Sequence, residues 1–144
     1  MPNVTVVMAA YNSESTVLKA IESIQNQTYE DWEMIICDDC STDSTYELIL
    51  DAQKNDSRII LIKNERNMYA AYSRNKCIEL ARGEYIVIQD SDDYSHPERI
   101  KESINYLNDN NSISFVSTSA FFFSNDKIWG ERVLEEGIKN KKDL

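Results

Sequence analysis

Short apolar runs alternate along the chain with longer stretches in which apolar residues recur every three or four positions. The first run, 3–10, is apolar and rich in β-branched residues, a pattern typical of a strand buried on both faces. Later runs of similar character predict three more strands, at 32–37, 58–62 and 85–89.

The stretches between these runs predict helices. Val17, Ile21 and Ile24 recur at helical spacing after Ser13, which we expect to be the N-cap. Three later groups predict helices in the same way: Leu48, Ile49 and Ala52; Cys77, Leu80 and Ala81; and, after Pro97, Ile100, Ile104 and Leu107. Two further runs, 112–118 and 120–123, predict two more strands, and beyond residue 125 the pattern dissolves.

Regular alternation of strand and helix predicts an α/β fold, a mainly parallel sheet flanked by helices and joined by right-handed crossovers. We expect residues 1–144 to form a single domain. In such sheets ligands bind outside the carboxyl ends of the strands, where the strand order reverses. The residues delivered there are Ala10, Tyr11 and Asn12; Asp38 and Asp39; and Asp90, Ser91, Asp92 and Asp93.

The charge balance argues against one class of partner. With 25 acidic and 15 basic residues the net charge is −10, so the surface field repels polyanions, and we find no basic stripe of a nucleic-acid binder. Three cysteines do not suit a disulfide framework, and no signal peptide opens the chain, so we expect the reducing cytosol. Cys37 and Cys40 form a CxxC that lacks further zinc ligands, and we interpret their spacing as coincidental.

The acidic clusters predict a metal site. Carboxylates held close together repel, and they stay ionised at little cost only when a cation lies between them. Oxygen ligands suit Mg²⁺ or Mn²⁺, which also bind diphosphates, and the sequence has no glycine-rich phosphate loop. The alternative is that Asp90 to Asp93 form a solvated turn that caps the next helix. Likewise, Tyr11 either packs or stacks on a base, and Asp38 either joins the site or caps its loop.

These residues follow an order that resembles the N-terminal, nucleotide-binding half of inverting family 2 glycosyltransferases with the GT-A fold. The resemblance rests on an apolar strand leading into A-Y-N, an S-x-x-x-Q-T-Y stretch, D-D-x-S-T-D, and G-E-Y-I before a D-x-D. It covers residues 3–107. It implies that Tyr11 lies against the nucleobase, that Asp39 hydrogen-bonds the base, and that Ala10 allows close approach of the backbone.

The resemblance also implies roles around the diphosphate. Asp92 would touch the divalent metal, Mg²⁺ or Mn²⁺, and Asp90 would lie near the ribose, with Ser91 in the same nucleotide-binding set. Asp93 is a weaker candidate for the metal shell. Arg74, in A-R-N, either approaches the nucleotide or forms an exposed salt bridge.

The function implied is transfer of a sugar, with inversion, from a nucleotide-diphosphate sugar (by the family's habit a UDP-sugar) to a saccharide or lipid-linked acceptor in polysaccharide synthesis. The whole protein would act in the cytoplasm, at the inner face of a membrane. The sequence departs from the family's N-x-G at 67–69, where we expect a differently shaped loop. The acceptor half is not found, so its general base is expected beyond Leu144, and no motif assigns Glu135 or Glu136 to that role.

Two alternatives remain open. One is a non-catalytic nucleotide-sugar-binding module. Another is a phosphoacceptor signalling domain, which requires a lysine at a late strand end, whereas here the third strand ends in Lys63 and the fourth in acids. An unfinished sheet edge or an exposed 120–123 face would also favour a homo-oligomer.

Overall fold

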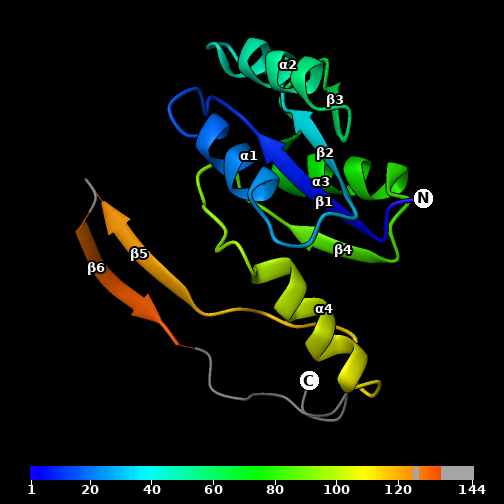
Figure 1. Cartoon of the computed structure of the whole chain (residues 1–144). Coiled ribbons are helices and arrows are strands. Elements are labelled where there is room, and N and C mark those ends of the chain that lie inside the picture. Colours follow the sequence, from blue (N-terminus) through cyan, green and yellow to red (C-terminus); the bar gives the residue numbers. More distant parts are fainter. Residues whose placement is uncertain (125–126, 134–144) are drawn as a thin grey trace. The chain divides into compact units, whose positions relative to one another are not determined.

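The computed structural model describes residues 1–124 and 127–133. Strands and helices alternate along the first part of this range (Figure 1). In chain order the elements are β1 (Val4–Ala10), α1 (Val17–Gln25), β2 (Trp32–Asp38), α2 (Thr45–Asn55), β3 (Ile59–Lys63), α3 (Tyr69–Leu80), β4 (Tyr85–Ile88), α4 (Arg99–Asp109), β5 (Ala120–Ser124) and β6 (Lys127–Arg132). The chain divides into two compact units, Met1–Ile100 and Lys101–Leu144. That residues 1–144 form a single domain stays a prediction.

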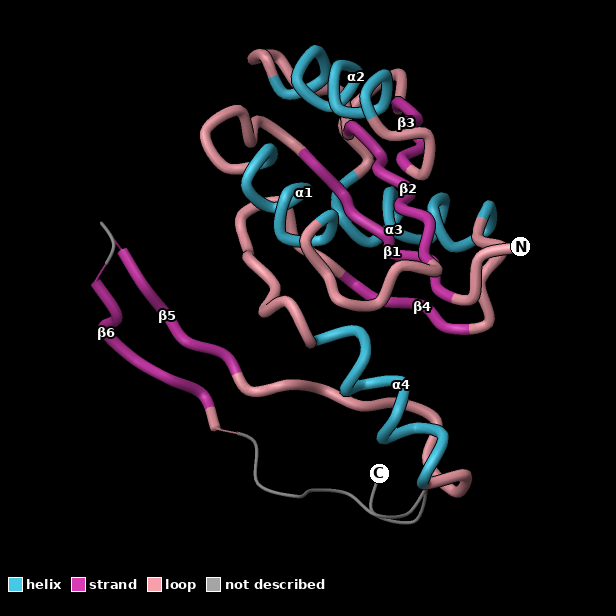
Figure 2. The backbone as a smooth tube through the Cα atoms, in the orientation of Figure 1, coloured by secondary structure: helices cyan, strands magenta, loops and turns pink. Residues whose placement is uncertain are grey.

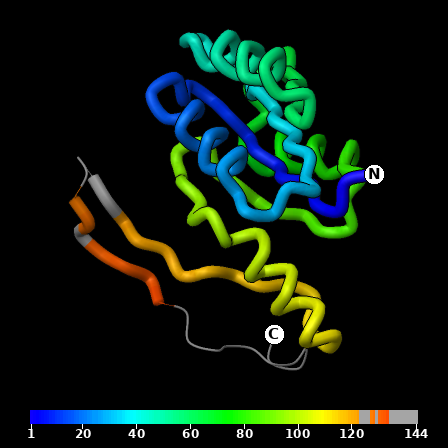
Figure 3. Tube along the Cα trace, in the orientation of Figure 1, coloured from blue at the N-terminus to red at the C-terminus, as the bar shows by residue number. Residues whose placement is uncertain are grey.

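The first unit is built on a four-stranded sheet in the order β3-β2-β1-β4, with every neighbouring pair parallel, as predicted. The chain runs outward from β1 to β3 and then returns to form β4 on the other side of β1, a course that Figure 3 traces by colour. Because parallel crossovers are right-handed, this reversal places α1 and α2 on one face and α3 on the other (Figure 2). The reversal falls between β1 and β4.

Both faces of the sheet are buried around its centre. All seven residues of β2 are buried, and the predicted stripe of α1 is confirmed, since Val17, Ile21 and Ile24 are each 1% exposed or less. On the face covered by α3, a separate apolar cluster joins the strands to the helix: Val7, Ile35, Cys37 and Cys77, with Ile60 and Ile62 packed against it. The sheet therefore holds its carboxyl ends on a rigid base.

A cluster of polar side chains around Glu33 lies at the amino-terminal end of the sheet. Glu33, 2% exposed, accepts hydrogen bonds at Oε1 from Thr5 Oγ1 (2.8 Å) and from the backbone N–H of Arg82 (2.9 Å). Its Oε2 accepts from the Arg82 guanidinium, at 2.8 Å from Nε. Gly83 lies so close to β1 that an added Cβ would come within 2.5 Å of the Thr5 backbone nitrogen. Only glycine fits there.

Two predictions about the helices were wrong. Ser13 is not the N-cap of α1, because the helix begins at Val17 after Thr16, and the Ser13 carbonyl accepts hydrogen bonds from both residues in a preceding turn. Leu80 is not buried but 50% exposed. The inward face of α3 is narrow and is formed by Ser73 and Cys77, one turn apart.

The strand predictions beyond α4 were right in one place and wrong in two. Residues 112–118 are not a strand, and Phe115 there is 64% exposed. Strand 120–123 is confirmed as part of β5, which pairs antiparallel with β6, a strand that the sequence analysis missed. The strand β6 contains Gly130 and both charge signs, so it carries no apolar run to reveal it. In the described part of the chain, every helix is too short or too polar to cross a membrane.

Candidate functional site

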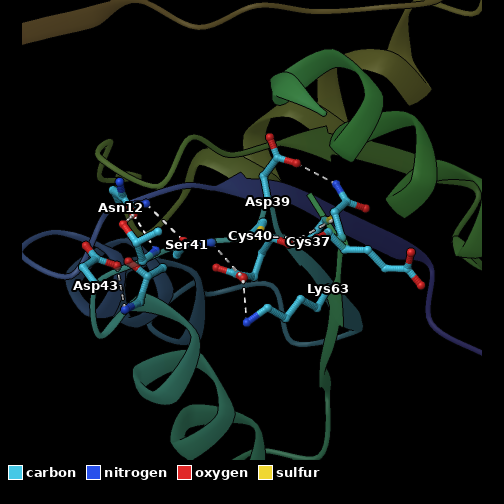
Figure 4. A network of polar contacts seen from close by, with 12 residues as sticks. Asn12, Cys37, Asp39, Cys40, Ser41, Asp43 and Lys63 are labelled. Atoms are coloured by element: carbon cyan, nitrogen blue, oxygen red, sulfur yellow. Dashed lines mark hydrogen bonds and ion pairs between the residues drawn. The ribbon is translucent and has the colours of Figure 1, made fainter. Parts of the chain in front are cut away.

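The loops that follow β1 and β2 are interlocked at the carboxyl edge of the sheet (Figure 4). Asn12 donates its backbone N–H to Ser41 Oγ (3.1 Å), and its Oδ1 accepts from the Thr42 backbone N–H (2.9 Å). Glu14 forms a second reciprocal pair of hydrogen bonds between the same two loops. It donates its backbone N–H to Asp43 Oδ2 (3.2 Å) and accepts at Oε2 from the Ser44 backbone N–H (3.0 Å).

The interlock holds two residues in the left-handed region, Asn12 at φ 48° and Cys40 at φ 64°. Asparagine tolerates this conformation better than most residues, whereas cysteine gains nothing from it. Such positions persist where the surrounding contacts over-determine the backbone. The two loops thus form one pre-shaped platform.

Asp39 has one carboxylate oxygen committed to the fold. The residue is 2% exposed, and its Oδ1 accepts hydrogen bonds from Asn64 Nδ2 (2.7 Å) and from the Met68 backbone N–H (2.8 Å). Asn64 is itself fixed, because it also donates to Ser73 Oγ (2.9 Å) and accepts at Oδ1 from Lys76 Nζ (3.1 Å). In Figure 4 the Asp39 carboxylate points away from the Asp43 side of the network. In the described residues no hydrogen bond uses Oδ2.

Asp38 has the structural role considered among the alternatives. It is fully buried, its Oδ2 accepts from the Ser41 backbone N–H (3.2 Å), and the same oxygen lies 3.7 Å from Lys63 Nζ. The Lys63 ammonium also sits 4.2 Å from the centroid of the Tyr46 ring. These contacts show that Asp38 caps the loop after β2.

The acidic loop, which we define as residues 89–95, follows β4 on the other side of β1. Asp90 forms an ion pair with Arg74 from α3, the salt bridge that was one of the two roles expected for Arg74. The side chains are 44% and 31% exposed, so this pair stays in contact with solvent. Arg74 Nε is buried and has no hydrogen-bond partner in the described structure. The Nε–H of this arginine is therefore a buried, unused donor.

Ser91 ties the acidic loop to the platform, because its Oγ lies 2.8 Å from Ser13 Oγ. At the other acidic cluster, the Asp39 backbone N–H donates to the Ala10 carbonyl at 2.8 Å. Ala10 is 1% exposed, whereas Tyr11, which follows it, is 47% exposed. The two acidic groups are therefore linked through the loop that follows β1.

The carboxylates of the acidic loop act on one another. Partial burial raises the pKa of Asp93, and the negative charges of Asp92 and Asp90 raise it further against the lowering effect of Arg99. A hydrogen bond from the Asp93 N–H to the Asp90 carbonyl (3.3 Å) closes the turn that holds them together. Asp92 is exposed at its tip. A divalent cation would relieve this repulsion, and carboxylate oxygens are suitable donors for Mg²⁺ or Mn²⁺.

Within residues 1–124 and 127–133, no group of three or more His, Cys, Asp or Glu side chains converges as a ready-made metal cage. Mg²⁺ commonly uses only one or two protein carboxylates and completes its shell with substrate phosphates and water. The residues present fit that open kind of site.

The cysteines occupy positions consistent with a coincidental CxxC. Cys37 is buried in β2, and Cys77 of α3 is buried with its Sγ 3.7 Å from the Met8 carbonyl. The neighbouring Cys37 thiol and burial raise the pKa of Cys77 far above its usual range. Cys40 lies instead in the loop, with its Sγ 3.7 Å from the Glu65 carbonyl. Cys37 and Cys40 are thus close in sequence but lie in different environments, one in the core and one in the loop.

Three residues of the site escaped the sequence analysis: Asn64, Gln89 and Arg99. Asn64 and Gln89 come directly after β3 and β4, so their position at strand ends was a usable signal. Both are uncharged, and their importance lies in buried hydrogen bonds that composition does not reveal. Glu135 and Glu136 lie outside the described residues.

A doubly wound parallel sheet with an acidic loop at its switch point defines this chain as a GT-A type α/β protein. The chain belongs to glycosyl transferase family 2, whose family model matches residues 5–143. It is 40% identical over 132 residues to WfaP of Escherichia coli, a UDP-Glc:alpha-D-GlcNAc-diphosphoundecaprenol beta-1,3-glucosyltransferase, a match that covers 92% of this chain and 48% of that protein. The chain spans about half the length of the curated relatives it matches.

Solved structures show the same fold. The S. aureus TarS structure in complex with UDP-GlcNAc aligns with a TM-score of 0.73 and 26% identity, covering 88% of this chain and 36% of that chain. The mannosyltransferase PcManGT from Pyrobaculum calidifontis, in complex with GDP-Man and Mn²⁺, aligns with a TM-score of 0.69 over 74% of this chain and 32% of its own. At 23% identity, the second likeness concerns the fold alone.

Proposed function

We propose that this chain is the donor-binding part of a glycosyltransferase that transfers a sugar from a UDP-sugar to an acceptor hydroxyl with inversion. The observation that carries the proposal is the acidic loop, where Asp90, Asp92 and Asp93 crowd together beside the platform formed by the two loops after β1 and β2. A carboxyl group such as Asp93, whose pKa is raised by partial burial and by acidic neighbours at a sheet's switch point, is characteristic of a functional site.

In this proposal the platform binds the nucleobase. Asp39 keeps Oδ1 for Asn64 and Met68, so Oδ2 accepts a hydrogen bond from a base N–H, and uracil offers one at its pairing edge. Tyr11, 47% exposed, stacks on the base, and the small side chain of Ala10 lets the ligand approach the backbone. The TarS complex with UDP-GlcNAc supports a uridine donor.

The acidic loop binds the ribose and the diphosphate. Asp92 holds the divalent cation, Asp90 and Ser91 lie near the ribose, and Arg74 turns its unused Nε donor toward the nucleotide. Bound there, Mg²⁺ or Mn²⁺ supplies Lewis-acid stabilisation of the charge that grows on the departing nucleoside diphosphate. The platform keeps the donor oriented so that the acceptor hydroxyl attacks from the opposite face of the sugar.

The acceptor in this proposal is a saccharide or lipid-linked saccharide, in the synthesis of a surface polysaccharide at the cytoplasmic face of a membrane. The WfaP relative, whose name specifies a diphosphoundecaprenol acceptor, supports this class. The carboxylate that deprotonates the acceptor hydroxyl is assigned to no residue of this chain, and self-association stays a prediction. A second candidate is a non-catalytic nucleotide-sugar-binding module.

Calorimetric titration of UDP, with and without Mn²⁺, tests the proposal on the wild-type chain, on Asp92→Ala and on Asp51→Ala. Asp51 is exposed on α2 and serves as the matched control. We expect Mn²⁺ to tighten UDP binding at least tenfold in the wild type and the control, and to have no effect in Asp92→Ala. Equal binding with and without Mn²⁺ would refute the metal role, and no UDP binding in either condition would refute the donor site. Release of sugar from UDP-sugar by the chain would favour the enzyme over the binding module.

A further inference from the structure

We infer that Gln89 and Arg99 are positioning residues that hold the acidic loop in its metal-binding shape before any metal arrives. This inference deepens the proposed function and rests on it for the identity of the ligand. The two residues form a buried polar brace beneath the loop, and neither was among the residues that the sequence singled out.

Gln89 is the centre of the brace. Its side chain is 1% exposed, and its carboxamide lies inside the curve of the acidic loop. Its Nε2 donates to the Asp90 carbonyl (3.1 Å) and to the Asp93 carbonyl (2.7 Å), so one amide group closes both ends of the turn that carries the carboxylates. Its Oε1 accepts from Ser95 Oγ at 2.6 Å. In the described part of the chain, the hydrogen bonds of the Gln89 carboxamide thus all go to the acidic loop or to Arg99.

Arg99, the first residue of α4, completes the brace. Its Nη1 donates to Gln89 Oε1 (3.0 Å) and to Ser95 Oγ (2.8 Å), and its Nη2 donates to the Ile88 carbonyl at the end of β4 (2.9 Å). These three bonds use the planar fork of the guanidinium, which an ammonium group cannot reproduce. Arg99 therefore joins the start of the loop to its end.

A second glutamine anchors the segment that leads from the loop into α4. Gln27, 5% exposed and two residues beyond the end of α1, donates its Nε2 to the His96 carbonyl (2.7 Å) and accepts at Oε1 from the Ile100 backbone N–H (3.0 Å). The Ser95 N–H donates to Ser23 Oγ (3.1 Å). The brace thus rests on α1, which belongs to the rigid part of the sheet unit.

The brace also balances charge. Arg99 attracts Asp93 and Asp90, while Arg74 forms an ion pair with Asp90. The loop carries three carboxylates, so two cations offset part of their repulsion in the absence of metal. A preformed loop spares the ordering that a flexible loop would undergo on binding, which strengthens binding of the metal.

Gln89→Glu and Arg99→Lys test the brace separately. In Gln89→Glu the two donors to the Asp90 and Asp93 carbonyls become acceptors, and in Arg99→Lys the charge stays while the fork is lost. Arg58→Lys is the control, because Arg58 also makes a bidentate contact, with Asp56, at the start of β3. The first readout is amide hydrogen exchange of Asp93 and Ser95 in the metal-free proteins.

We expect exchange at these two amides to accelerate at least tenfold in both brace variants, while β2 keeps its protection and Arg58→Lys leaves the loop unchanged. Unchanged exchange at Asp93 and Ser95 in a folded variant would overturn the inference. If Arg99→Lys fails to fold, Gln89→Glu decides, and Ser95→Ala, which removes one partner of each brace residue, provides a milder third variant.

The second readout is the Mn²⁺-dependent part of UDP binding. We expect it to weaken at least tenfold in both brace variants, while metal-free UDP binding stays within twofold of the wild type. Retention of full Mn²⁺ dependence in a variant whose loop exchanges rapidly would also overturn the inference. Absence of Mn²⁺ dependence in the wild type would refute the proposed function instead, and hydrogen exchange would still decide whether the brace holds the loop.

Discussion

Two carboxylates of the first unit, Glu33 and Asp93, have opposite surroundings. Burial tends to raise the pKa of Glu33, but hydrogen bonds from Arg82 and Thr5 outweigh it and hold the pKa below its usual value. At Asp93, partial burial and the neighbouring charges of Asp92 and Asp90 win over the attraction of Arg99, and the pKa is raised. Glu33 lies in the amino-terminal half of the sheet and Asp93 at its carboxyl edge.

The difference separates a carboxylate that serves the fold from one that serves a site. Glu33 has protein donors for both oxygens, so its charge is stabilised within the fold and nothing further is needed. The carboxylates of the acidic loop repel one another, and in the proposed function a divalent cation would relieve this repulsion. Substitutions at the two ends of the sheet should therefore separate stability from binding.

The largest effect is expected from Gly83→Ala at the amino-terminal end. The new Cβ would meet the Thr5 nitrogen at 2.5 Å and the Val4 carbonyl carbon at 2.6 Å, both backbone atoms that cannot move aside alone. We expect unfolding free energy to fall by about 3 kcal/mol, at the upper end of overpacking effects. Gly130→Ala is the control, because its Cβ would meet only the Phe122 side chain, at 3.6 Å. Equal urea midpoints for the two variants would contradict the close approach.

Glu33→Gln should come next, with a loss of about 2 kcal/mol at neutral pH, since hydrogen bonds to a charged group are lost. A carboxyl group whose pKa is lowered on folding stabilises the protein above its unfolded pKa, and this contribution disappears as the pH falls. The difference between wild type and variant should therefore shrink below pH 4.5, the usual value for this group. Thermal unfolding at pH 7 and pH 3 measures it. A difference that does not depend on pH would show that packing alone is involved.

At the carboxyl edge, Asn64→Ala should weaken UDP binding about tenfold, or roughly 1.4 kcal/mol, because Asp39 loses the donor that fixes its carboxylate. The loss should be the same with and without Mn²⁺, since Asn64 lies on the base side of the site. Gln53→Ala controls for loss of a structural amide, the one that accepts from the Leu61 N–H at 3.0 Å. If a folded Asn64→Ala variant binds UDP as tightly as the wild type, the proposed role of Asp39 in binding the base is wrong.

The smallest effect, and the one of opposite sign, is expected from Asp93→Asn. A carboxyl group whose pKa is raised on folding destabilises the folded protein increasingly as the pH rises through the group's unfolded pKa. Removal of the Asp93 charge should therefore stabilise the protein at pH 7. The gain should be about 0.5 kcal/mol or less, because solvent screens the loop. It should vanish below pH 3.8, the usual value for this group. Chemical denaturation at both pH values measures it, and destabilisation at pH 7 would end the contrast with Glu33.

The sequence predicted the sheet and its helices well because apolar periodicity is a local signal. Strands β1 to β4 follow apolar runs, and the inward face of α1 follows from the spacing of its isoleucines. It failed at residues 112–118 and at β6, where pairing partners rather than composition decide which segment becomes a strand. Leu80 shows the same limit, since the width of a helix's buried face depends on what it packs against.

The site could be predicted only in part, for a related reason. Charged residues at strand ends, such as Asp39 and Asp90, stand out in the sequence because they come directly after apolar runs. Asn64, Gln89 and Arg99 act through hydrogen bonds to backbone and side-chain atoms whose positions exist only in the folded chain. No spacing rule connects Gln89 to the Asp93 carbonyl or Arg99 to that of Ile88.

The interlock between the loops after β1 and β2 has a consequence for kinetics. Asn12 and Glu14 bind residues about thirty positions away in sequence through reciprocal pairs of hydrogen bonds, which hold the platform proposed to bind the base in one shape. A ligand that binds to this platform should therefore need no preceding conformational change of the protein. The observed association rate of uridine nucleotides should rise linearly with their concentration, without the plateau of a preceding conformational step.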